Sequence, residues 1–249
     1  MKIKLTAIIT GLSVLILSQP CSAQTVKTGV EPFPPLIVDK STGYTIDLLK
    51  AIEAVSDLKF DIRIMSYTRA KYDLKRSESD MIAHTPYRLE TDDFYAYALE
   101  LDWNMETRSD LFAMSDYKFN KINNLLIGIP RGNKEFAAEL LGLPAKNFYE
   151  SSIENLLEML QKGRIDAFWF ERASTMTMLK KLKISNVFYM KMPKDTIPVG
   201  IAVQKNDKGL QLKDKIDSLI KKIDQEKLFK DYSVYLKMPD SGVFKISEK

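Results

Sequence analysis

The 249-residue sequence has very little of the two side chains on which much metal and nucleophilic chemistry depends. It contains one cysteine and one histidine. Cys21 lies in an N-terminal leader-like segment, so the remainder has no disulfide, no thiol nucleophile and no thiolate metal site. The single histidine, His84, excludes multi-histidine metal sites but leaves carboxylate chemistry open. The formal net charge is only +4, and Lys and Arg are spread along the chain, so the composition does not indicate binding to nucleic acid.

Long apolar runs are also lacking, with one exception near the N-terminus. Residues 5–17 are apolar or small, follow Lys2 and Lys4, and precede the segment 20–23, Pro-Cys-Ser-Ala. This pattern is typical of a secretory signal peptide with cleavage after Ala23. The run is shorter than the roughly 20 residues that a membrane-spanning helix needs. A retained anchor, or a lipoprotein signal that uses Cys21, fits the pattern less well.

Short strand-like stretches alternate with amphipathic stretches through the rest of the chain, and no repeat is visible. The alternation predicts an α/β protein with mostly parallel sheets, and its recurrence after residue 125 indicates two lobes. In such sheets, ligands bind where strands end and helices begin, which directs attention to 31–35, 84–88, 131–133 and Glu171. Strands are predicted at 25–30, 60–64, 80–83, 110–114, 125–129, 165–170, 187–190 and 199–203. Helices are predicted at 44–55, 134–141 and 153–162, from the end of the strand at 165–170 to about residue 182, and over about 212–223. Ser151 and Glu154 are expected to form a capping box for the helix at 153–162.

Seven short segments occur in the order and at roughly the spacing of one known family. They are 29–36 (GVEPFPPL), 43–48 (GYTIDL), 67–70 (YTRA), 85–88 (TPYR), 128–132 (GIPRG), 163–167 (GRIDA) and 199–203 (VGIAV). On these segments, nearly all of the chain after the leader resembles the family 3 extracellular solute-binding proteins, which are the polar amino-acid-binding proteins of bacterial periplasms.

The resemblance implies a type II periplasmic binding fold. Such a protein has two α/β lobes, each with a central, mostly parallel sheet flanked by helices, and two crossing strands join the lobes. Lobe one would comprise residues 24–112 and 200–249, lobe two would comprise 113–199, and the lobes would close by a hinge motion.

The implied function is capture of a small zwitterionic or acidic ligand, such as an amino acid or related carboxylate, in the cleft between the lobes. The protein would be periplasmic and monomeric, and would deliver its ligand to an inner-membrane ABC permease or to a sensor. On this interpretation it is not an enzyme, and no cofactor, metal or nucleic acid is expected.

The resemblance also assigns charged and polar site residues. Arg88 matches the arginine that holds the ligand carboxylate, for which a planar guanidinium offers two parallel donors. Glu171 matches the acid that accepts the ligand ammonium. Thr85 either donates to the same carboxylate or caps a helix, and Asn133 either marks a helix N-terminus that takes a carboxylate or is a plain N-cap. Arg69 is a candidate second carboxylate donor.

Aromatic residues supply the remaining candidates. Phe33 and Tyr67 look like the walls against which family ligands pack, and Trp169 lies in the strand that leads to Glu171. Each of these side chains could equally be part of a hydrophobic core. His84 would either edge the cleft and make binding pH-sensitive or make only a local hydrogen bond.

The segment from Asp80 to Arg88 is shorter than its counterpart in amino-acid binders, and this departure keeps two alternatives open. The first is a periplasmic dehydratase of the prephenate or arogenate type, with Glu171 and His84 as the candidate acid and base. The second is a degenerate scaffold whose cleft no longer binds a ligand.

Overall fold

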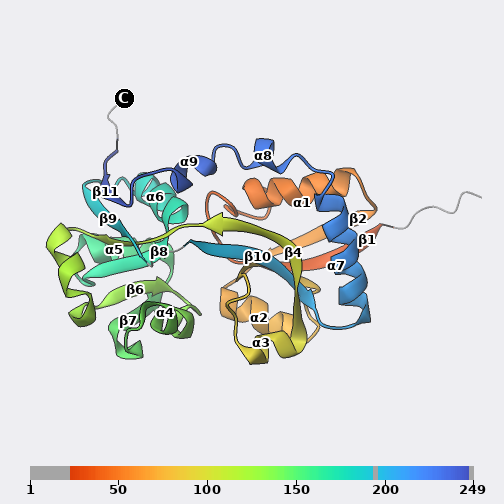
Figure 1. Ribbon diagram of the computed structural model, residues 1–249, viewed down its shortest axis with the longest axis horizontal. Helices are drawn as coiled ribbons and strands as arrows, with labels where there is room; N and C mark the ends of the chain where they lie inside the picture. Colours follow the sequence, from red (N-terminus) through yellow and green to blue (C-terminus); the bar gives the residue numbers. More distant parts are fainter. Residues whose placement is uncertain (1–22, 193–195, 247–249) are drawn as a thin grey trace, which may run out of the picture.

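The computed structural model describes residues 23–192 and 196–246, and the predicted leader lies outside this range apart from Ala23. Figure 1 shows two lobes side by side, each built on one sheet. Within the described ranges, no helix combines the length and apolar character needed to cross a membrane.

The first lobe is built on a five-stranded sheet with the order β2-β1-β3-β10-β4. β1 pairs in parallel with β2 and β3, whereas β10 is antiparallel to both β3 and β4. Helices α1, α2 and α7 pack against these strands. The elements are β1 (Gln24–Val30), α1 (Tyr44–Ala54), β2 (Leu58–Ile64), α2 (Tyr67–Lys75), β3 (Met81–Pro86), α3 (Asp92–Tyr97), β4 (Ala98–Thr107), β10 (Ile197–Gln204) and α7 (Asp207–Ile220).

The second lobe is built on a six-stranded sheet with the order β11-β9-β5-β8-β6-β7. β6 pairs in parallel with β7 and β8, and the other pairings are antiparallel. Both sheets are therefore mixed rather than mostly parallel. The elements are β5 (Ser109–Ala113), η1 (Asp116–Asn124), β6 (Ile127–Pro130), α4 (Lys134–Leu141), η2 (Ala145–Asn147), β7 (Phe148–Ser151), α5 (Ile153–Gln161), β8 (Ala167–Glu171), α6 (Arg172–Lys181), β9 (Val187–Lys191) and β11 (Ser241–Phe244).

Burial of apolar side chains explains why these segments fold as they do. β3 and β5 lie inside their sheets and every residue in each is buried. In α5, Ile153, Leu156, Leu157 and Leu160 form one buried stripe, as the helical period requires. Ser152, rather than the predicted Ser151, caps this helix by accepting a hydrogen bond from the Asn155 N–H.

Two strand crossings join the lobes, as expected. Only Arg108 separates β4 from β5, and β10 enters the first sheet beside this point. The Thr107 hydroxyl donates to the Ile197 carbonyl at 2.6 Å, which holds the two crossings together. The cleft between the lobes opens from this double connection.

The C-terminal segment makes a third crossing that the sequence analysis did not anticipate. After α7, the short helices α8 (Gln225–Leu228) and α9 (Ser233–Leu236) run from the first lobe to the second, where β11 pairs with β9 (Figure 1). The expected division placed residues 200–249, and residues up to 112, in lobe one. Strand pairing places 241–244 and 109–112, which that division assigned to lobe one, in the second sheet.

Candidate functional site

A small inner cavity lies where the two sheets meet. Its volume is about 40 Å³. A cavity of this size holds one or a few water molecules, whereas sites for small organic ligands typically measure about 300–1,000 Å³. Its lining comes from both lobes and comprises Glu31, Phe33, Tyr67, His84, Pro86, Thr107, Ser109, Asn133, Phe136, Trp169, Phe170, Glu171, Ile197 and Val199.

Aromatic rings close this inner cavity. Phe33, in the loop after β1, packs edge-on against Phe170 of β8 with 5.1 Å between ring centroids, so the contact bridges the lobes. The Trp169 indole N–H donates to the Met192 carbonyl at 2.7 Å. The Tyr67 hydroxyl donates to the Glu90 carboxylate at 2.5 Å. Because Trp169 and Tyr67 already have polar partners, they form fixed walls.

A larger groove between the lobes adjoins the inner cavity. Its volume is about 400 Å³, which is enough for a small organic solute. Glu31 lines both spaces and therefore stands at their junction. The groove walls come from the first lobe (Glu31, Pro32, Pro34, Val38, Ile64, Met65 and Ser66) and the second lobe (Pro130, Arg131, Ser151, Ser152, Ile153, Glu154, Met178 and Lys181).

Glu31 is a half-buried carboxyl group without a cation of its own in the described residues. The Tyr67 backbone N–H donates to it, and Lys71 is the nearby cation. Lys71, however, pairs with Glu90 at 3.3 Å. Burial therefore dominates and raises the pKa of Glu31 to about 8.

The loop between β6 and α4 brings Arg131 to the opposite wall of the groove. Gly132 has a φ of 86°, and a side chain there would place its Cβ 2.2 Å from the Thr68 hydroxyl of α2. Glycine thus lets this second-lobe loop touch the first lobe. The neighbouring Arg131 is exposed, and no ion pair or side-chain hydrogen bond joins it to another described residue. The other charged side chains of the second-lobe wall, Glu154 and Lys181, pair with each other at 3.7 Å.

Glu171 lines the inner cavity, as predicted, but its carboxylate is already occupied. It caps α6, accepting from the Ala173 and Ser174 N–H groups at 2.9 and 2.6 Å, and it accepts from the Tyr232 hydroxyl at 3.0 Å. Burial raises the pKa of Glu171 to about 7 despite these donors. The group acts in this conformation as a structural cap that contacts the cavity.

Arg88 is not among the residues that line the two interlobe spaces, whereas the prediction placed it opposite Glu171 across the cleft. The segment at 85–88 does not begin a helix, because β3 continues through Pro86 and a turn with a left-handed Arg88 (φ 59°) follows. The guanidinium of Arg88 lies over the Tyr87 ring, 5.1 Å from its centroid, and the side chain is exposed.

Thr85 and Arg69 are also absent from the walls of these spaces. Thr85 is buried within β3, so no helix begins there for it to cap, and its hydroxyl donates to Glu100 at 3.3 Å. Arg69 pairs on the surface with Asp73 and Glu78 at 2.6 and 3.3 Å.

Asn133 and His84 do line the inner cavity. Asn133 is the N-cap residue of α4, but its amide donates to the Pro130 carbonyl at 3.3 Å instead of capping the helix. His84 shares a 2.9 Å hydrogen bond with the Thr45 hydroxyl, and burial lowers the pKa of His84 to about 3. His84 therefore stays neutral near pH 7, so the local hydrogen-bonding alternative holds for it.

Of the eight predicted site residues, the inner cavity brings together Phe33, Tyr67, Asn133, Trp169 and Glu171. The sequence analysis assigned no role to Glu31 or Arg131, although both lie within quoted segments, GVEPFPPL and GIPRG. Glu31 and Arg131 are charged residues directly after β1 and β6, and this position was the signal that could have identified them from the sequence.

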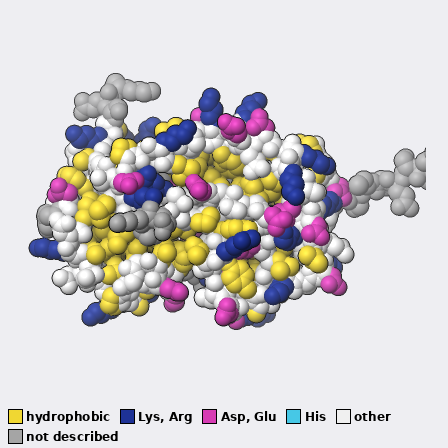
Figure 2. Space-filling view, viewed as in Figure 1, with side chains coloured by type: hydrophobic (Ala, Val, Ile, Leu, Met, Phe, Trp, Pro, Cys, Tyr) yellow, Lys and Arg dark blue, Asp and Glu magenta, His cyan; other side chains and the backbone are white. Residues whose placement is uncertain are grey.

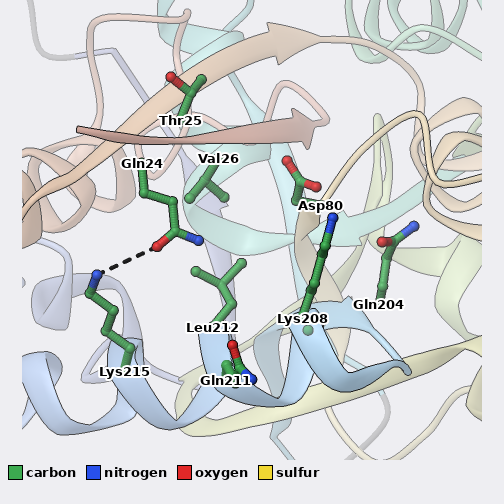
Figure 3. Close-up of a pocket in the computed structure, with 10 residues that line it drawn as sticks. Gln24, Thr25, Val26, Asp80, Gln204, Lys208, Gln211, Leu212 and Lys215 are labelled. Atoms are coloured by element: carbon green, nitrogen blue, oxygen red, sulfur yellow. Dashed lines mark hydrogen bonds between the residues drawn. The ribbon is translucent and has the colours of Figure 1, made fainter. Parts of the chain in front are cut away.

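A separate hollow of about 500 Å³ lies in the first lobe (Figure 3). Figure 3 shows Lys215 of α7 pointing toward Gln24 of β1, with the Lys215 ammonium donating to the Gln24 amide oxygen at 3.4 Å. The hollow is formed by one lobe alone, so closure of the lobes would not enclose it. Within the described residues, no cluster of three or more metal-ligating side chains occurs.

Comparison with known proteins shows the fold. No family model matches the chain, and no curated protein matches it. Among solved structures, the chain is similar to a histidine kinase sensor domain with similarity to periplasmic binding proteins, with 15% identity, a TM-score of 0.70, and coverage of 91% of this chain and 100% of the other.

Two amino-acid-binding proteins are similar to the same degree. One is the arginine-, lysine- and histidine-binding protein of Geobacillus stearothermophilus, with 21% identity, a TM-score of 0.69, and coverage of 87% of this chain and 97% of that protein. The other is an ABC uptake transporter substrate-binding protein of Streptococcus pneumoniae with bound histidine, with 15% identity, a TM-score of 0.69, and coverage of 88% and 95%. The chain therefore has the two-lobed type II periplasmic binding fold.

Proposed function

We propose that this chain, which has the two-lobed type II periplasmic binding fold, is a solute-binding protein that captures a small zwitterionic or acidic molecule, such as an amino acid, between its lobes. The observation that carries the proposal is the pair of adjoining interlobe spaces that share Glu31. Sites at the junction of two lobes are typical of small-molecule binding.

The hinge supports the same proposal. The crossings at Thr107–Ile197 lie beside the inner cavity, and both residues line it. A rotation about this point changes the separation between the Phe33 loop and the end of β8 that carries Phe170 far more than it changes the sheets themselves. A solute that contacts both lobes therefore favours the closed arrangement through its differential contacts.

The proposed cellular role is delivery of the solute to an inner-membrane ABC permease or to a sensor, from a periplasmic location. The similar structures include a substrate-binding protein of an amino acid ABC transporter and a histidine kinase sensor domain. The first name is that of a transporter's substrate-binding protein and the second is that of a kinase's sensor domain, and the choice between the two kinds of partner is part of the proposal to be tested.

One observation favours a second candidate, a scaffold that has lost ligand binding. The inner cavity measures only about 40 Å³ because Phe33 and Phe170 fill the space between the lobes. The test must therefore distinguish a protein that binds no solute from one whose solute occupies the larger groove.

A thermal-shift panel of amino acids and small organic acids provides this test. A solute present at 100 times its dissociation constant stabilises the folded state by about 2.7 kcal/mol. We expect at least one panel member to raise the unfolding midpoint of the wild type, and Val38→Trp to abolish the shift by filling the groove that Val38 lines.

Val55→Trp is the matched control. Val55 is 57% exposed, compared with 47% for Val38, and it lies at the end of α1 away from the groove lining. This variant should retain the wild-type shift. A flat response of the wild type across the whole panel would overturn the proposal in favour of the scaffold, and an equal shift in Val38→Trp would show that the solute binds elsewhere.

A further inference from the structure

We infer that the groove between the lobes recognises an amino acid with an apolar side chain, with Glu31 of the first lobe receiving the ammonium group and Arg131 of the second lobe receiving the carboxylate. This inference rests on the proposed function and adds a site, a charge arrangement and a ligand class to it. The arrangement reverses the one predicted from Arg88 and Glu171, in which the first lobe supplied the guanidinium.

The first argument is the unsatisfied carboxyl group. Glu31 stands at the inner end of the groove with a single backbone donor from Tyr67. Its neighbour Lys71 is engaged by Glu90 at 3.3 Å and also lies 4.6 Å from the centroid of the Tyr67 ring. An ammonium group placed beside Glu31 would supply the counter-charge that the described residues do not provide.

The second argument is the free guanidinium across the groove. Within the described part of the chain, Arg131 is the groove's charged residue from the second lobe that has no ion pair, since Glu154 and Lys181 pair with each other. A guanidinium binds a carboxylate through two parallel N–H donors. The backbone at Arg131 is held in place, because the adjacent Gly132 N–H donates to Glu150 at 2.7 Å and the loop contacts Thr68.

The third argument is the apolar surface that lines the groove together with the two charged residues. Val38 and Ile64 are 47% and 42% exposed, and both line the groove together with Met65, Ile153 and Met178, so they form part of one apolar surface. A ligand side chain that covers this surface removes apolar area from water on both partners. A polar or charged ligand side chain would lose hydration there without a polar partner.

A ligand series based on leucine tests the charge arrangement directly. Isopentylamine lacks only the carboxylate of leucine, and 4-methylpentanoate lacks only its ammonium group. By isothermal titration calorimetry we expect leucine, methionine or phenylalanine to bind, and each truncated leucine analogue to bind at least about 10-fold more weakly than leucine, because each loses one charge-assisted interaction.

Two substitutions test which residue binds the ammonium and which binds the carboxylate of the ligand. Glu31→Gln should weaken leucine at least about 10-fold and leave 4-methylpentanoate unchanged, whereas Arg131→Gln should weaken leucine similarly and leave isopentylamine unchanged. Glu135→Gln and Arg164→Gln are the controls, since both residues are exposed and lie outside the groove. These controls should bind leucine as the wild type does.

The pH dependence gives an independent readout. The inner cavity and the groove also place Tyr67, His84, Glu171, Arg131, Glu154 and Lys181 around Glu31, with Lys71 and its partner Glu90 nearby. Burial lowers the pKa of His84 to about 3 and raises that of Glu171 to about 7, so Glu171 titrates in the same range as Glu31, whose pKa is about 8. Leucine affinity should therefore rise from pH 6 to pH 9 in the wild type, and Glu31→Gln should remove the part of this rise centred near pH 8; an undiminished rise in Glu31→Gln would contradict the assignment.

The outcomes separate this inference from the proposed function. If Val38→Trp abolishes binding of a solute that Glu31→Gln and Arg131→Gln bind normally, the charge assignment is overturned and solute capture stands. If isopentylamine or 4-methylpentanoate binds as tightly as leucine, the amino acid class is overturned. If no solute binds the wild type, the proposed function fails and this inference fails with it.

Discussion

Two carboxyl groups, the half-buried Glu31 and the buried Glu171, have the most unusual environments at the scale of single residues. An ionised carboxylate loses hydration on burial, and hydrogen bonds recover only part of that free energy. Glu171 has two backbone donors and the Tyr232 hydroxyl, whereas Glu31 has one backbone donor. The pKa of Glu31 therefore lies higher than that of Glu171, at about 8 compared with about 7.

The raised pKa of Glu31 predicts how stability changes with pH. Between its ordinary value near 4.5 and about 8, the folded protein holds a proton at Glu31 that the unfolded chain has released. The free energy of unfolding therefore falls as pH rises through this window. We expect urea denaturation of Glu31→Gln to show a flatter decline from pH 6 to pH 9 than the wild type or the exposed control Glu135→Gln shows. An identical decline in all three proteins would contradict the assigned environment.

The C-terminal crossing segment is the main feature at the scale of structural elements. Arg108 and Arg172 are buried, and both donate to backbone carbonyls of this segment, including that of Pro239 at 3.1 and 3.0 Å. Arg172 also pairs with Asp110, which is fully buried. These two arginines attach the C-terminal segment to the second lobe and so complete the third crossing.

Removal of Arg172 should strongly destabilise the fold. Arg172→Ala leaves Asp110 buried without its closest cation, and breaking a buried pair in this way costs about 3–5 kcal/mol. Equilibrium unfolding in urea measures this loss. Lys181→Ala is the control, because Lys181 belongs to an exposed pair with Glu154 and should change stability by less than about 1 kcal/mol. A loss below about 1 kcal/mol in Arg172→Ala would show that the crossing is held by other contacts.

Sequence patterns predicted some elements well and missed others, for reasons that are local to each. The predicted helices at 44–55, 134–141 and 153–162 agree with α1, α4 and α5 within one residue, because each carries a strong apolar stripe or clear caps. β4 was missed because it is an edge strand whose exposed positions interrupt its apolar pattern. β11 was missed because only its pairing with β9 defines it.

The site was less predictable than the fold. Family-like segments located the loops that converge between the lobes, but the position of each side chain depends on backbone detail. Arg88 points outward because its residue adopts a left-handed turn, and Thr85 is turned toward Glu100. Glu31 and Arg131 gain their importance only when the two lobes are in contact.

At the scale of the whole molecule, described residues of both lobes line a ligand-sized space between them. The inner cavity is filled by aromatic rings, whereas the groove beside it remains open at about 400 Å³. The surface in view in Figure 2 intersperses basic and acidic side chains, so charge of one sign does not dominate it. Capture of a zwitterion between the lobes is consistent with this distribution.

The most direct test of the account is a crystal structure of the protein with the panel solute that gives the largest thermal shift. The account predicts electron density for the solute in the interlobe groove, with its ammonium beside the Glu31 carboxylate and its carboxylate on the Arg131 guanidinium. Density for the solute anywhere outside the space between the lobes, or an empty groove in crystals grown with saturating solute, would contradict it.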